Sequence, residues 1–276
     1  MPELPEVETI RRYLTKDLTG KTIKKIDVLV KKQFIGNPKI LEGKKIKEVI
    51  RFGKVLSLKF SDSLYLSVHL KLTGQLLVGK NNILYKKNIP HLNTNKLPAK
   101  TTHIIIYFTD KTILYFNDLR KFGWMKVVST PEKPKGIDVL SKNFTQKYFT
   151  DQTDSTDKLI KLLLMDQDKL AGIGNIYAND ALFLAKIHPL RKSKSLSSQE
   201  INRLFAAIKQ VIKDGLKYNG ASDESYVLPD ASLGRYQNHF QVYGRENESC
   251  RICKTPIIRI KHGGRSSFFC PICQKL

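Results

Sequence analysis

All four cysteines of this chain lie in its last 27 residues, where they form two Cys-x2-Cys pairs. Cys250 and Cys253 make the first pair, and Cys270 and Cys273 follow after an interval of sixteen residues. Two such pairs at this separation can place four thiolates at the corners of a tetrahedron, which suits Zn2+. Two disulfides are the alternative, but they are typical of secreted proteins. The sequence therefore predicts one structural zinc ion held by four cysteines.

The interval between the two cysteine pairs has the pattern of a β-hairpin. Ile258, Ile260 and Phe268 alternate with polar neighbours. A Gly-Gly pair at 263–264 lies between them, where a two-residue hairpin turn requires positive φ angles. Arg265 follows the turn and is expected to point outward, either as a solvated charge or as a contact to a nucleic-acid phosphate. We thus expect a zinc-ribbon hairpin with an arginine at its tip.

The charge balance favours a polyanionic partner. Lys and Arg number 48 against 25 Asp and Glu, a formal net charge of +23, although a generally lysine-rich proteome would give the same balance. Each phosphate that such a protein neutralises releases counterions and raises affinity. No stretch approaches the roughly 18 consecutive apolar residues of a membrane-spanning helix. The acidic, proline-interrupted start differs from a signal peptide, so we expect a cytoplasmic protein.

Hydrophobic periodicity predicts a β-rich part followed by a helical part. Leu4, Val7, Ile10 and Leu14 have helical spacing, and alternating apolar residues predict strands at 26–30, 56–60, 64–70, 104–108 and 113–116. The polar, proline-containing segment 129–156 is predicted to be a linker. Helices are expected at 159–165, 176–184 and 198–218, and Ser197-x-x-Glu200 marks the start of the last one as a capping box.

The first residues of the chain could carry chemistry. If Met1 is removed, Pro2 exposes a secondary amine, and an α-amino pKa of roughly 7.7 to 8.0 leaves a neutral, nucleophilic fraction near neutral pH. Such an amine can attack a sugar C1′ and form a Schiff base, with Glu3 placed to move protons and Glu6 to hold the amine or the helix end. The alternative is an ordinary helix start, because proline and acidic residues both favour a first turn.

Several motifs, taken together and in order, resemble those of the bacterial formamidopyrimidine-DNA glycosylases (the Fpg/MutM family). They lie at residues 1–9, 69–74, 118–123, 171–178 and 242–245 and at the terminal cysteine pairs. The resemblance implies an α+β fold: an N-terminal antiparallel β-sandwich flanked by a helix, then a helical helix-two-turn-helix domain with a zinc-ribbon β-hairpin. The implied divisions are a catalytic domain at 1–130, a linker at 131–156, a helix-two-turn-helix domain with a lesion-capping loop at 157–240, and a zinc finger at 241–276.

The resemblance also implies a reaction. Members of this family excise oxidised purines such as 8-oxoguanine and formamidopyrimidines from duplex DNA, and then nick the abasic site by β,δ-elimination. By position, Pro2 would be the Schiff-base nucleophile and Glu3 the general acid/base, with Glu6 beside them. Lys54 would assist β-elimination and contact phosphate, and Arg265 would assist the δ-step.

DNA contacts are implied for a further set of residues. Leu72 and Phe122 would fill the gap left by an extruded nucleotide, and Arg120 would bond the orphaned base; by default, Leu72 and Phe122 are strand-end core residues. Leu72 stands where the family commonly has methionine. Further contacts to DNA are implied for His69, Asn175, Tyr243 and Lys158. The lesion-capping loop would include Ser222, Tyr226 and Tyr236.

Two other functions remain open on the sequence alone. The endonuclease VIII branch favours oxidised pyrimidines, and a zinc-ribbon DNA-binding protein without catalysis would use Pro2 and Glu3 only as a helix start. The resemblance favours a monomer that acts on damaged or abasic double-stranded DNA, without a membrane, in association with the bacterial nucleoid.

Overall fold

The computed structural model describes residues 1–80, 84–89 and 94–276, and it divides the chain into two compact units. The first unit consists of Met1–Lys133 and Tyr218–Gln237, and the second consists of Pro134–Lys217 and Asn238–Leu276. The boundaries expected from the motifs, at 130, 156 and 240, stay a prediction. No helix in the described part of the chain is both long enough and apolar enough to cross a membrane.

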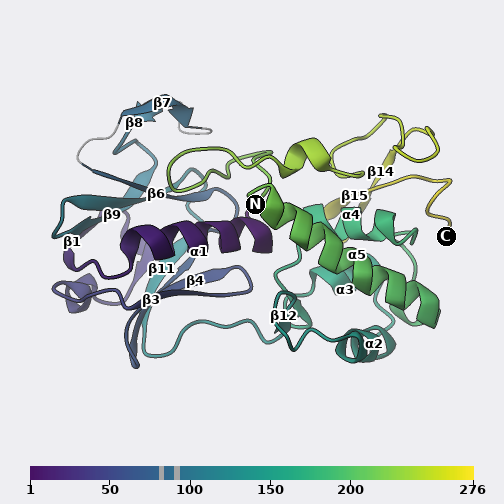
Figure 1. Cartoon of the computed structure of the whole chain (residues 1–276), viewed down its shortest axis with the longest axis horizontal. Helices are drawn as coiled ribbons and strands as arrows, with labels where there is room; N and C mark the ends of the chain where they lie inside the picture. The colour runs from purple at the N-terminus through teal and green to yellow at the C-terminus, as the bar shows by residue number, and fades with distance from the viewer. Residues whose placement is uncertain (81–83, 90–93) are drawn as a thin grey trace. The chain divides into compact units, whose positions relative to one another are not determined.

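The first unit contains helix α1 (Leu4–Leu18) and two sheets (Figure 1). One sheet has four antiparallel strands in the order β1 (Ile23–Val28), β9 (Thr102–Phe108), β10 (Thr112–Asp118) and β6 (Gly74–Lys80). The other has the order β2 (Phe34–Ile35), β11 (Trp124–Val128), β5 (Leu64–His69), β4 (Val55–Ser61) and β3 (Glu48–Phe52), and only its β2–β11 pair is parallel. The unit also holds the turns η1 (Lys31–Gln33) and η2 (Pro38–Leu41) and an antiparallel pair, β7 (Leu84–Ile89) with β8 (Thr94–Lys96).

The main core of the first unit lies between α1 and the two sheets. Val7 and Ile10 of α1 belong to one buried cluster with Leu58 of β4 and with Ile104 and Ile106 of β9. Full burial of such a side chain contributes about 1.5–3 kcal/mol, so this cluster fixes the helix against the sheets. The predicted β-sandwich with a flanking helix is therefore confirmed.

The second unit is mainly helical (Figure 1). Its elements are α2 (Gln146–Asp154), α3 (Ile160–Met165), α4 (Asn175–Leu184), η3 (Ser193–Ser195), α5 (Ser198–Lys217), the parallel pair β12 (Ile137–Asp138) and β13 (Leu170–Ala171), and the hairpin β14 (Ile258–His262) with β15 (Arg265–Phe269). The turn η4 (Tyr236–His239) joins the two units along the sequence.

Helix α5 begins with the predicted capping box. The Ser197 N–H donates to Glu200 Oε2 at 2.8 Å, and the Glu200 N–H donates to Ser197 Oγ at 3.3 Å. Leu196 and Ile201 are buried on either side of the cap, as a hydrophobic staple requires. These local bonds satisfy N–H groups that a helix end otherwise leaves without partners, so the start of α5 is encoded locally.

The polar segment predicted to be a linker is more structured than its composition suggested. It contains β12 and α2, and α2 begins at the cap Thr145, whose side chain accepts the N–H of Tyr148. Phe144 and Phe149 are buried against the ring of Phe205 in α5, at centroid distances of 5.1 and 6.2 Å. Two aromatic residues are enough to anchor a helix whose other residues are mostly polar, and a composition argument overlooks so small an apolar face.

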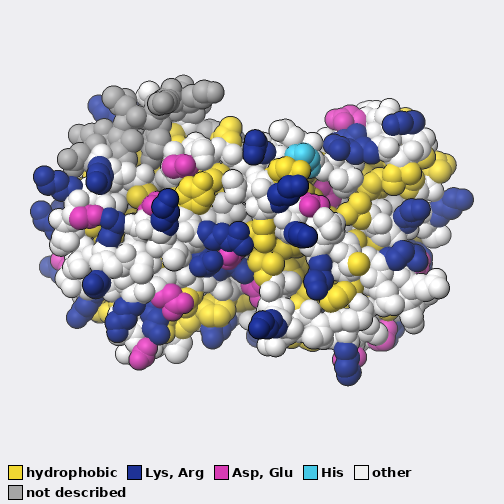
Figure 2. Space-filling model, viewed as in Figure 1, with side chains coloured by type: hydrophobic (Ala, Val, Ile, Leu, Met, Phe, Trp, Pro, Cys, Tyr) yellow, Lys and Arg dark blue, Asp and Glu magenta, His cyan; other side chains and the backbone are white. Residues whose placement is uncertain are grey.

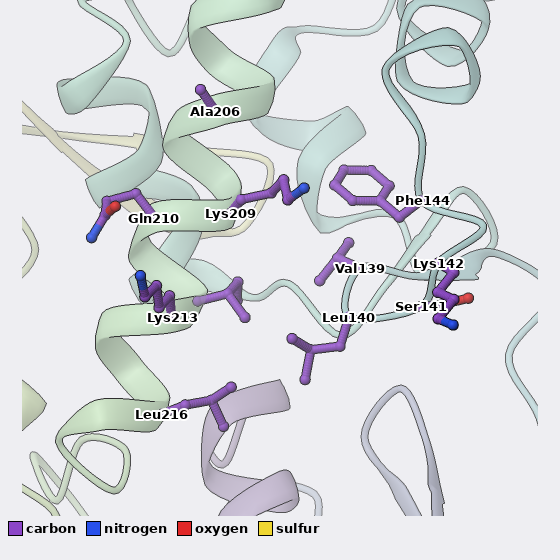
Figure 3. Close-up of a pocket in the computed structure, with 11 residues that line it drawn as sticks. Val139, Leu140, Ser141, Lys142, Phe144, Ala206, Lys209, Gln210, Lys213 and Leu216 are labelled. Atoms are coloured by element: carbon purple, nitrogen blue, oxygen red, sulfur yellow. The ribbon is translucent and has the colours of Figure 1, made fainter.

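A cavity of about 660 Å³ lies between α5 and the segment Val139–Phe144 of the second unit (Figure 3). Leu140 and Phe144 line one side, and Lys209, Lys213 and Leu216 of α5 line the other. None of the site residues expected from the sequence lines this cavity. The candidate active site therefore lies elsewhere in the structure.

Candidate active site and zinc centre

The amino end of α1 places Pro2, Glu3 and Glu6 in a buried position. Glu3 is 2% exposed and Glu6 is 1% exposed, and Pro2 is also buried. Glu6 Oε2 accepts the N–H of Glu3 at 2.8 Å, and its other oxygen accepts the N–H of Ala221 at 2.8 Å. Glu6 thus caps α1 and at the same time fixes the segment that contains Ala221. Of the two roles that the sequence suggested for Glu6, holding the amine or the helix end, the structure shows the second.

As long as Met1 precedes Pro2, the Pro2 nitrogen is a peptide nitrogen and cannot act as an amine. The Met1 ammonium lies 3.2 Å from Glu224 Oε2, in an ion pair whose carboxylate is largely exposed. Exposed ion pairs of this kind contribute only about 0–1 kcal/mol, so this contact does not hold Met1 strongly. Removal of Met1 would leave the new amine of Pro2 directly beside Glu3.

Lys54 lies on a two-residue turn between β3 and β4. Phe52 and Val55 pair across the ladder, and Gly53 takes a positive φ of 56°. The Arg51 guanidinium donates to the Gly53 carbonyl at 2.8 Å, which holds the turn. Lys54 is only 8% exposed. A lysine held in a tight turn in this way is a fixed cation rather than a solvated surface charge.

His69 is a neutral hydrogen-bond donor beside this lysine. Burial, together with the charges of Lys71 and Lys54, lowers the pKa of His69 to about 3. Its Nδ1 accepts the N–H of Lys71 at 3.0 Å, so the ring proton lies on Nε2. The ring also packs against Trp124 at a centroid distance of 5.8 Å. His69 can therefore offer an N–H to a phosphate without itself carrying charge.

Two neighbouring turns of the first unit carry the residues expected to enter DNA. Leu72 lies between β5 and β6 and is half-buried, whereas Phe122 lies between β10 and β11 and is 53% exposed. Arg120 is exposed as well, and its guanidinium lies over the Phe122 ring at 5.0 Å from the centroid. The default assignment of Phe122 to the core is wrong. An exposed phenylalanine stacked with an arginine is suited to contact bases.

The segment 219–236 packs on the first unit in this structure. Tyr226 and Tyr236 are both buried, and the Tyr226 hydroxyl donates to the Asn219 carbonyl at 3.0 Å. Ser222 is half-buried, and its Oγ accepts the N–H of Gly234 at 2.9 Å. The contact of these residues with a lesion stays a prediction.

The same segment reaches both the amino end of α1 and one of the two exposed turns. Besides the bond from Ala221 to Glu6, the Ser225 hydroxyl donates to the Leu72 carbonyl at 3.0 Å. The Gln75 amide in turn donates to the Ser225 carbonyl at 2.6 Å. The candidate catalytic residues and Leu72 are thus fixed by one continuous stretch of chain.

The four cysteines form one compact cluster in the second unit. All four are free thiols, and their sulfur atoms lie within 4.8 Å of one another. The Cys250–Cys273 and Cys253–Cys270 sulfurs are 3.9 and 3.4 Å apart. Zn–S bonds of about 2.3 Å in a tetrahedron require sulfur separations of roughly 3.8 Å, whereas a disulfide requires about 2.05 Å. The donor set therefore fits one structural zinc ion, and the disulfide alternative is excluded.

The hairpin that carries Arg265 is built as expected. His262 pairs with Arg265 across the turn, and Gly263 and Gly264 have φ angles of 56° and 73°. Arg265 is exposed, and its side chain makes no hydrogen bond or ion pair within the described ranges. The anchor of the hairpin is Lys161 of α3, a residue that was not predicted from the sequence.

Lys161 is 1% exposed, and its ammonium donates to the Ser266 carbonyl at 2.6 Å and to Ser267 Oγ at 2.8 Å. These bonds fix β15 immediately beside Arg265. The sequence could have indicated this anchor, because Lys161 interrupts the otherwise apolar sequence of α3 and a buried lysine needs hydrogen-bond partners.

The remaining DNA-contact candidates also belong to the second unit. Asn175 is the first residue of α4, and its side chain accepts the Asn179 amide at 3.3 Å. Tyr243 packs edge-on against Phe268 of the hairpin at 5.4 Å. Lys158 is paired with Asp166 at 2.7 Å, so a phosphate would have to share or replace that carboxylate. Their contacts to DNA stay predictions.

Positive charge is spread widely over the face of the molecule seen in Figure 2. Figure 2 shows Lys and Arg side chains across the visible face, interrupted by fewer acidic ones. This distribution agrees with the composition of the chain, which has 48 basic and 25 acidic residues. Such a surface attracts a polyanion over a large area.

Comparisons with known proteins connect these features. Three family models match consecutive parts of the chain: the formamidopyrimidine-DNA glycosylase N-terminal domain at residues 1–125, the formamidopyrimidine-DNA glycosylase H2TH domain at 136–226, and a zinc finger found in FPG and IleRS at 247–276. The chain is 38% identical over 287 residues to the formamidopyrimidine-DNA glycosylase of Listeria innocua, covering 100% of both proteins. It is 39% identical over 289 residues to that of Desulforamulus reducens, covering 100% of this chain and 99% of the relative.

Solved structures agree with the sequence matches. The MutM (Fpg) protein of Thermus thermophilus is similar with a TM-score of 0.86 and 34% identity, covering 99% of this chain and 98% of that one. A mutant Fpg of Lactococcus lactis in complex with Fapy-dG-containing DNA gives a TM-score of 0.87 and 32% identity over the full length of both chains.

The fold, the zinc centre and these matches define a DNA glycosylase of the helix-two-turn-helix class with a C-terminal zinc finger. More particularly, the chain belongs to the formamidopyrimidine-DNA glycosylase family. The expected fold class and the single structural zinc ion are confirmed.

Proposed function

We propose that this protein is a bifunctional DNA glycosylase and abasic-site lyase that removes oxidised purines, such as 8-oxoguanine and formamidopyrimidines, from duplex DNA. The observation that carries this proposal is its full-length similarity to proteins named formamidopyrimidine-DNA glycosylase, at 38–39% identity in the two relatives above. Structures of relatives bound to DNA with Fapy-dG, with an abasic site and with a carbocyclic 8-oxo-G support the substrate class.

The proposed first step joins Pro2 to the sugar of the damaged nucleotide. After removal of Met1, the neutral Pro2 amine attacks C1′ and the bond from C1′ to the base breaks; the proton lost by the amine nitrogen leaves with the base. The sugar ring then opens as O4′ takes a proton from Glu3, and the C1′–nitrogen bond becomes an iminium. Glu3 follows Pro2 directly in the chain and is buried, and both features support this assignment.

The proposed lyase steps use the iminium as an electron sink. Loss of a C2′ proton expels the 3′ phosphate, and loss of a C4′ proton expels the 5′ phosphate. Lys54 would hold the phosphate during the first elimination, and Arg265 would assist the second. The fixed turn of Lys54 and the exposed, anchored position of Arg265 support these roles. The neutral Nε2–H of His69 would bind a neighbouring phosphate.

Borohydride trapping tests the proposal, because reduction fixes an iminium that simple binding cannot form. The substrate is a duplex with 8-oxoguanine opposite cytosine, and two preparations are compared, one with Met1 removed and one with Met1 retained behind an added residue. We expect a covalent band only with the first preparation and equal binding of uncleaved duplex by both. Equal trapping by both would contradict the use of Pro2. Absence of trapping in both, with intact zinc and duplex binding, would favour a DNA-binding protein without catalysis.

A second candidate substrate class is oxidised pyrimidines. The observation that favours it is a structure of wild-type Lactococcus lactis Fpg with DNA that contains an oxidised pyrimidine. Excision rates on matched duplexes, one with 8-oxoguanine and one with an oxidised pyrimidine, would rank the two classes. Either substrate is chromosomal DNA, so we place the protein at the bacterial nucleoid, in the cytoplasm.

A further inference from the structure

We propose that Asp118 is the positioning residue that fixes Leu72, Arg120 and Phe122 in the arrangement that enters DNA and reads the base opposite the lesion. This inference rests on the proposed function. Asp118 lies at the end of β10, where the chain turns toward the exposed Arg120 and Phe122. Its side chain is 0% exposed, so it does not touch DNA itself.

The Asp118 carboxylate organises the turn that follows it. One oxygen, Oδ2, accepts the N–H of Gly123 at 2.7 Å and the side-chain amide of Gln33 at 3.0 Å. The other oxygen, Oδ1, accepts the N–H of Arg120 at 3.3 Å. Both ends of the segment that carries Phe122 are therefore bonded to one carboxylate. Charge-assisted bonds of this kind are stronger than neutral ones, and a buried carboxylate requires several of them.

The same carboxylate joins this turn to the neighbouring one. Thr73, next to Leu72, donates its hydroxyl to Asp118 Oδ1 at 2.5 Å, and its Oγ1 accepts the N–H of Arg120 at 2.9 Å. Asp118 and Thr73 thus hold the backbones of both turns in a fixed relation. Any change that loosens this pair would separate Leu72 from Arg120.

Both turns adopt backbone conformations that need such support. Lys71 precedes Leu72 with a φ of 53°, and Lys121 precedes Phe122 with a φ of 56°. Non-glycine residues rarely adopt this left-handed conformation unless surrounding bonds hold them there. Gly123 is required for a different reason, since a Cβ at this position would lie 2.8 Å from Phe116 Cζ and 3.1 Å from Asp118 Oδ2.

Asp118→Asn tests the inference, because it keeps the size of the side chain but replaces one oxygen by an NH2 group. In either orientation that NH2 group faces N–H or O–H donors, so about half of the four hydrogen bonds are lost. We expect the preference for cytosine over adenine opposite the lesion to fall by about tenfold, which is within what one base-reading guanidinium contributes. Arg120→Ala should produce the same fall, and the double variant should fall no further.

Trp124, the single tryptophan of the chain, gives a second readout that does not depend on catalysis. It follows Gly123 directly, so a loosened turn should increase acrylamide quenching of its fluorescence in Asp118→Asn. Asp110→Asn is the matched control, because Asp110 also accepts bonds from a turn of the same sheet, at the opposite end of β10. We expect this control to leave both readouts unchanged.

The outcomes separate the possible failures. An equal loss of excision opposite both bases, with unchanged quenching, would assign Asp118 to general stability and overturn the inference. If the wild-type protein excises neither lesion class, the proposed function fails, and the quenching comparison still decides whether Asp118 holds the turn. If Asp118→Asn does not fold, Thr73→Val replaces it, with Thr73→Ser as the variant that restores the hydroxyl and should restore both readouts.

Discussion

At the scale of single residues, burial determines the protonation state of His69. An exposed histidine near lysines could gain or lose a proton around neutral pH, but burial and the charges of Lys71 and Lys54 hold the pKa of His69 at about 3, well below its ordinary value of 6.5. The ring is therefore neutral at physiological pH. A neutral donor can bind a phosphate oxygen without a change of protonation when DNA arrives.

This pKa predicts how stability depends on pH. Above about pH 6.5 the His69 ring is neutral in both the folded and the unfolded chain; as the pH falls from 6.5 toward 3, only the unfolded chain takes up the proton. His69 therefore removes stability progressively over that window. We expect His69→Gln to lose less stability than the wild type between pH 7 and pH 5, measured by urea unfolding. The same substitution at His239 is the control, and parallel pH curves for wild type and His69→Gln would contradict the expectation.

At the scale of elements, a buried carboxylate joins α1, which carries the candidate residues Glu3 and Glu6 at its amino end, to the sheet. Glu8 of α1 accepts bonds from Arg11 at 2.8 Å, from Arg12 at 3.0 Å and from Arg51 of β3 at 3.0 Å. Burial by itself would raise the pKa of Glu8, but the hydrogen bonds and charges of Arg11 and Arg51 outweigh it and lower that pKa to about 2. The bond to Arg51 also links Glu8 to the turn that holds Lys54.

Glu8→Gln should therefore destabilise the protein in a pH-dependent way. A pKa lowered from 4.5 to about 2 would correspond to about 3 kcal/mol for a fully buried group; screening by solvent reduces the stability to about 1–2 kcal/mol, present above pH 4.5 and lost as the pH falls toward 2. We expect the variant to be less stable by about that amount at pH 7, with the difference shrinking at pH 3, in urea unfolding at both pH values. Glu48→Gln, at an exposed position on β3, is the control. A constant difference between pH 7 and pH 3 would argue against the ionic link.

The zinc hairpin is a second element whose stability is tied to particular residues. Its small core contains Phe183, Val242, Ile257 and Phe268 together with Cys250 and Cys270, two of the ligands themselves. A core of this size cannot stabilise a hairpin alone, so metal binding and folding of the hairpin are coupled.

Cys253→Ser should therefore lose zinc and weaken duplex binding together. Arg265→Gln is the matched control, since its exposed side chain lies on the same hairpin but supplies no ligand, and it should retain zinc. Elemental analysis and fluorescence titration with duplex DNA would measure the two properties. Retention of zinc by Cys253→Ser would refute the four-cysteine site.

Elements defined by local sequence could be predicted, and those that depend on distant partners could not. The capping box of α5 and the Gly-Gly turn of the hairpin need only residues within a few positions. By contrast, α2 is held by Phe205, more than fifty residues away from Phe149, and Gln33 reaches Asp118 across 85 positions. Periodicity and motifs do not reveal such long-range contacts. The family resemblance therefore indicated Arg120 and Phe122, but not the role that we propose for the Asp118 carboxylate in holding them.

At the scale of the whole molecule, the candidate residues divide between the two units. Pro2, Glu3, Lys54 and the two turns that carry Leu72 and Phe122 belong to the first unit, whereas Arg265 and the zinc centre belong to the second. In the proposed reaction, the first unit would supply the amine of Pro2 and the proton carrier Glu3, and the second unit would supply the exposed arginine of the hairpin.

The net charge of +23 leads to a test that separates directed phosphate contacts from general basicity. The logarithm of the binding constant falls linearly with the logarithm of salt concentration, with a slope of about −0.9 for each phosphate neutralised. If Arg265 contacts a phosphate, Arg265→Gln should make the slope less steep by about that amount. Lys39→Gln, an exposed lysine in η2, should leave it unchanged. The measurement is a potassium chloride titration of binding to a duplex with an uncleavable tetrahydrofuran abasic analogue. Equal small changes in both variants would mean that the surface attracts DNA only through its total charge, and the tip arginine would lose its assigned contact.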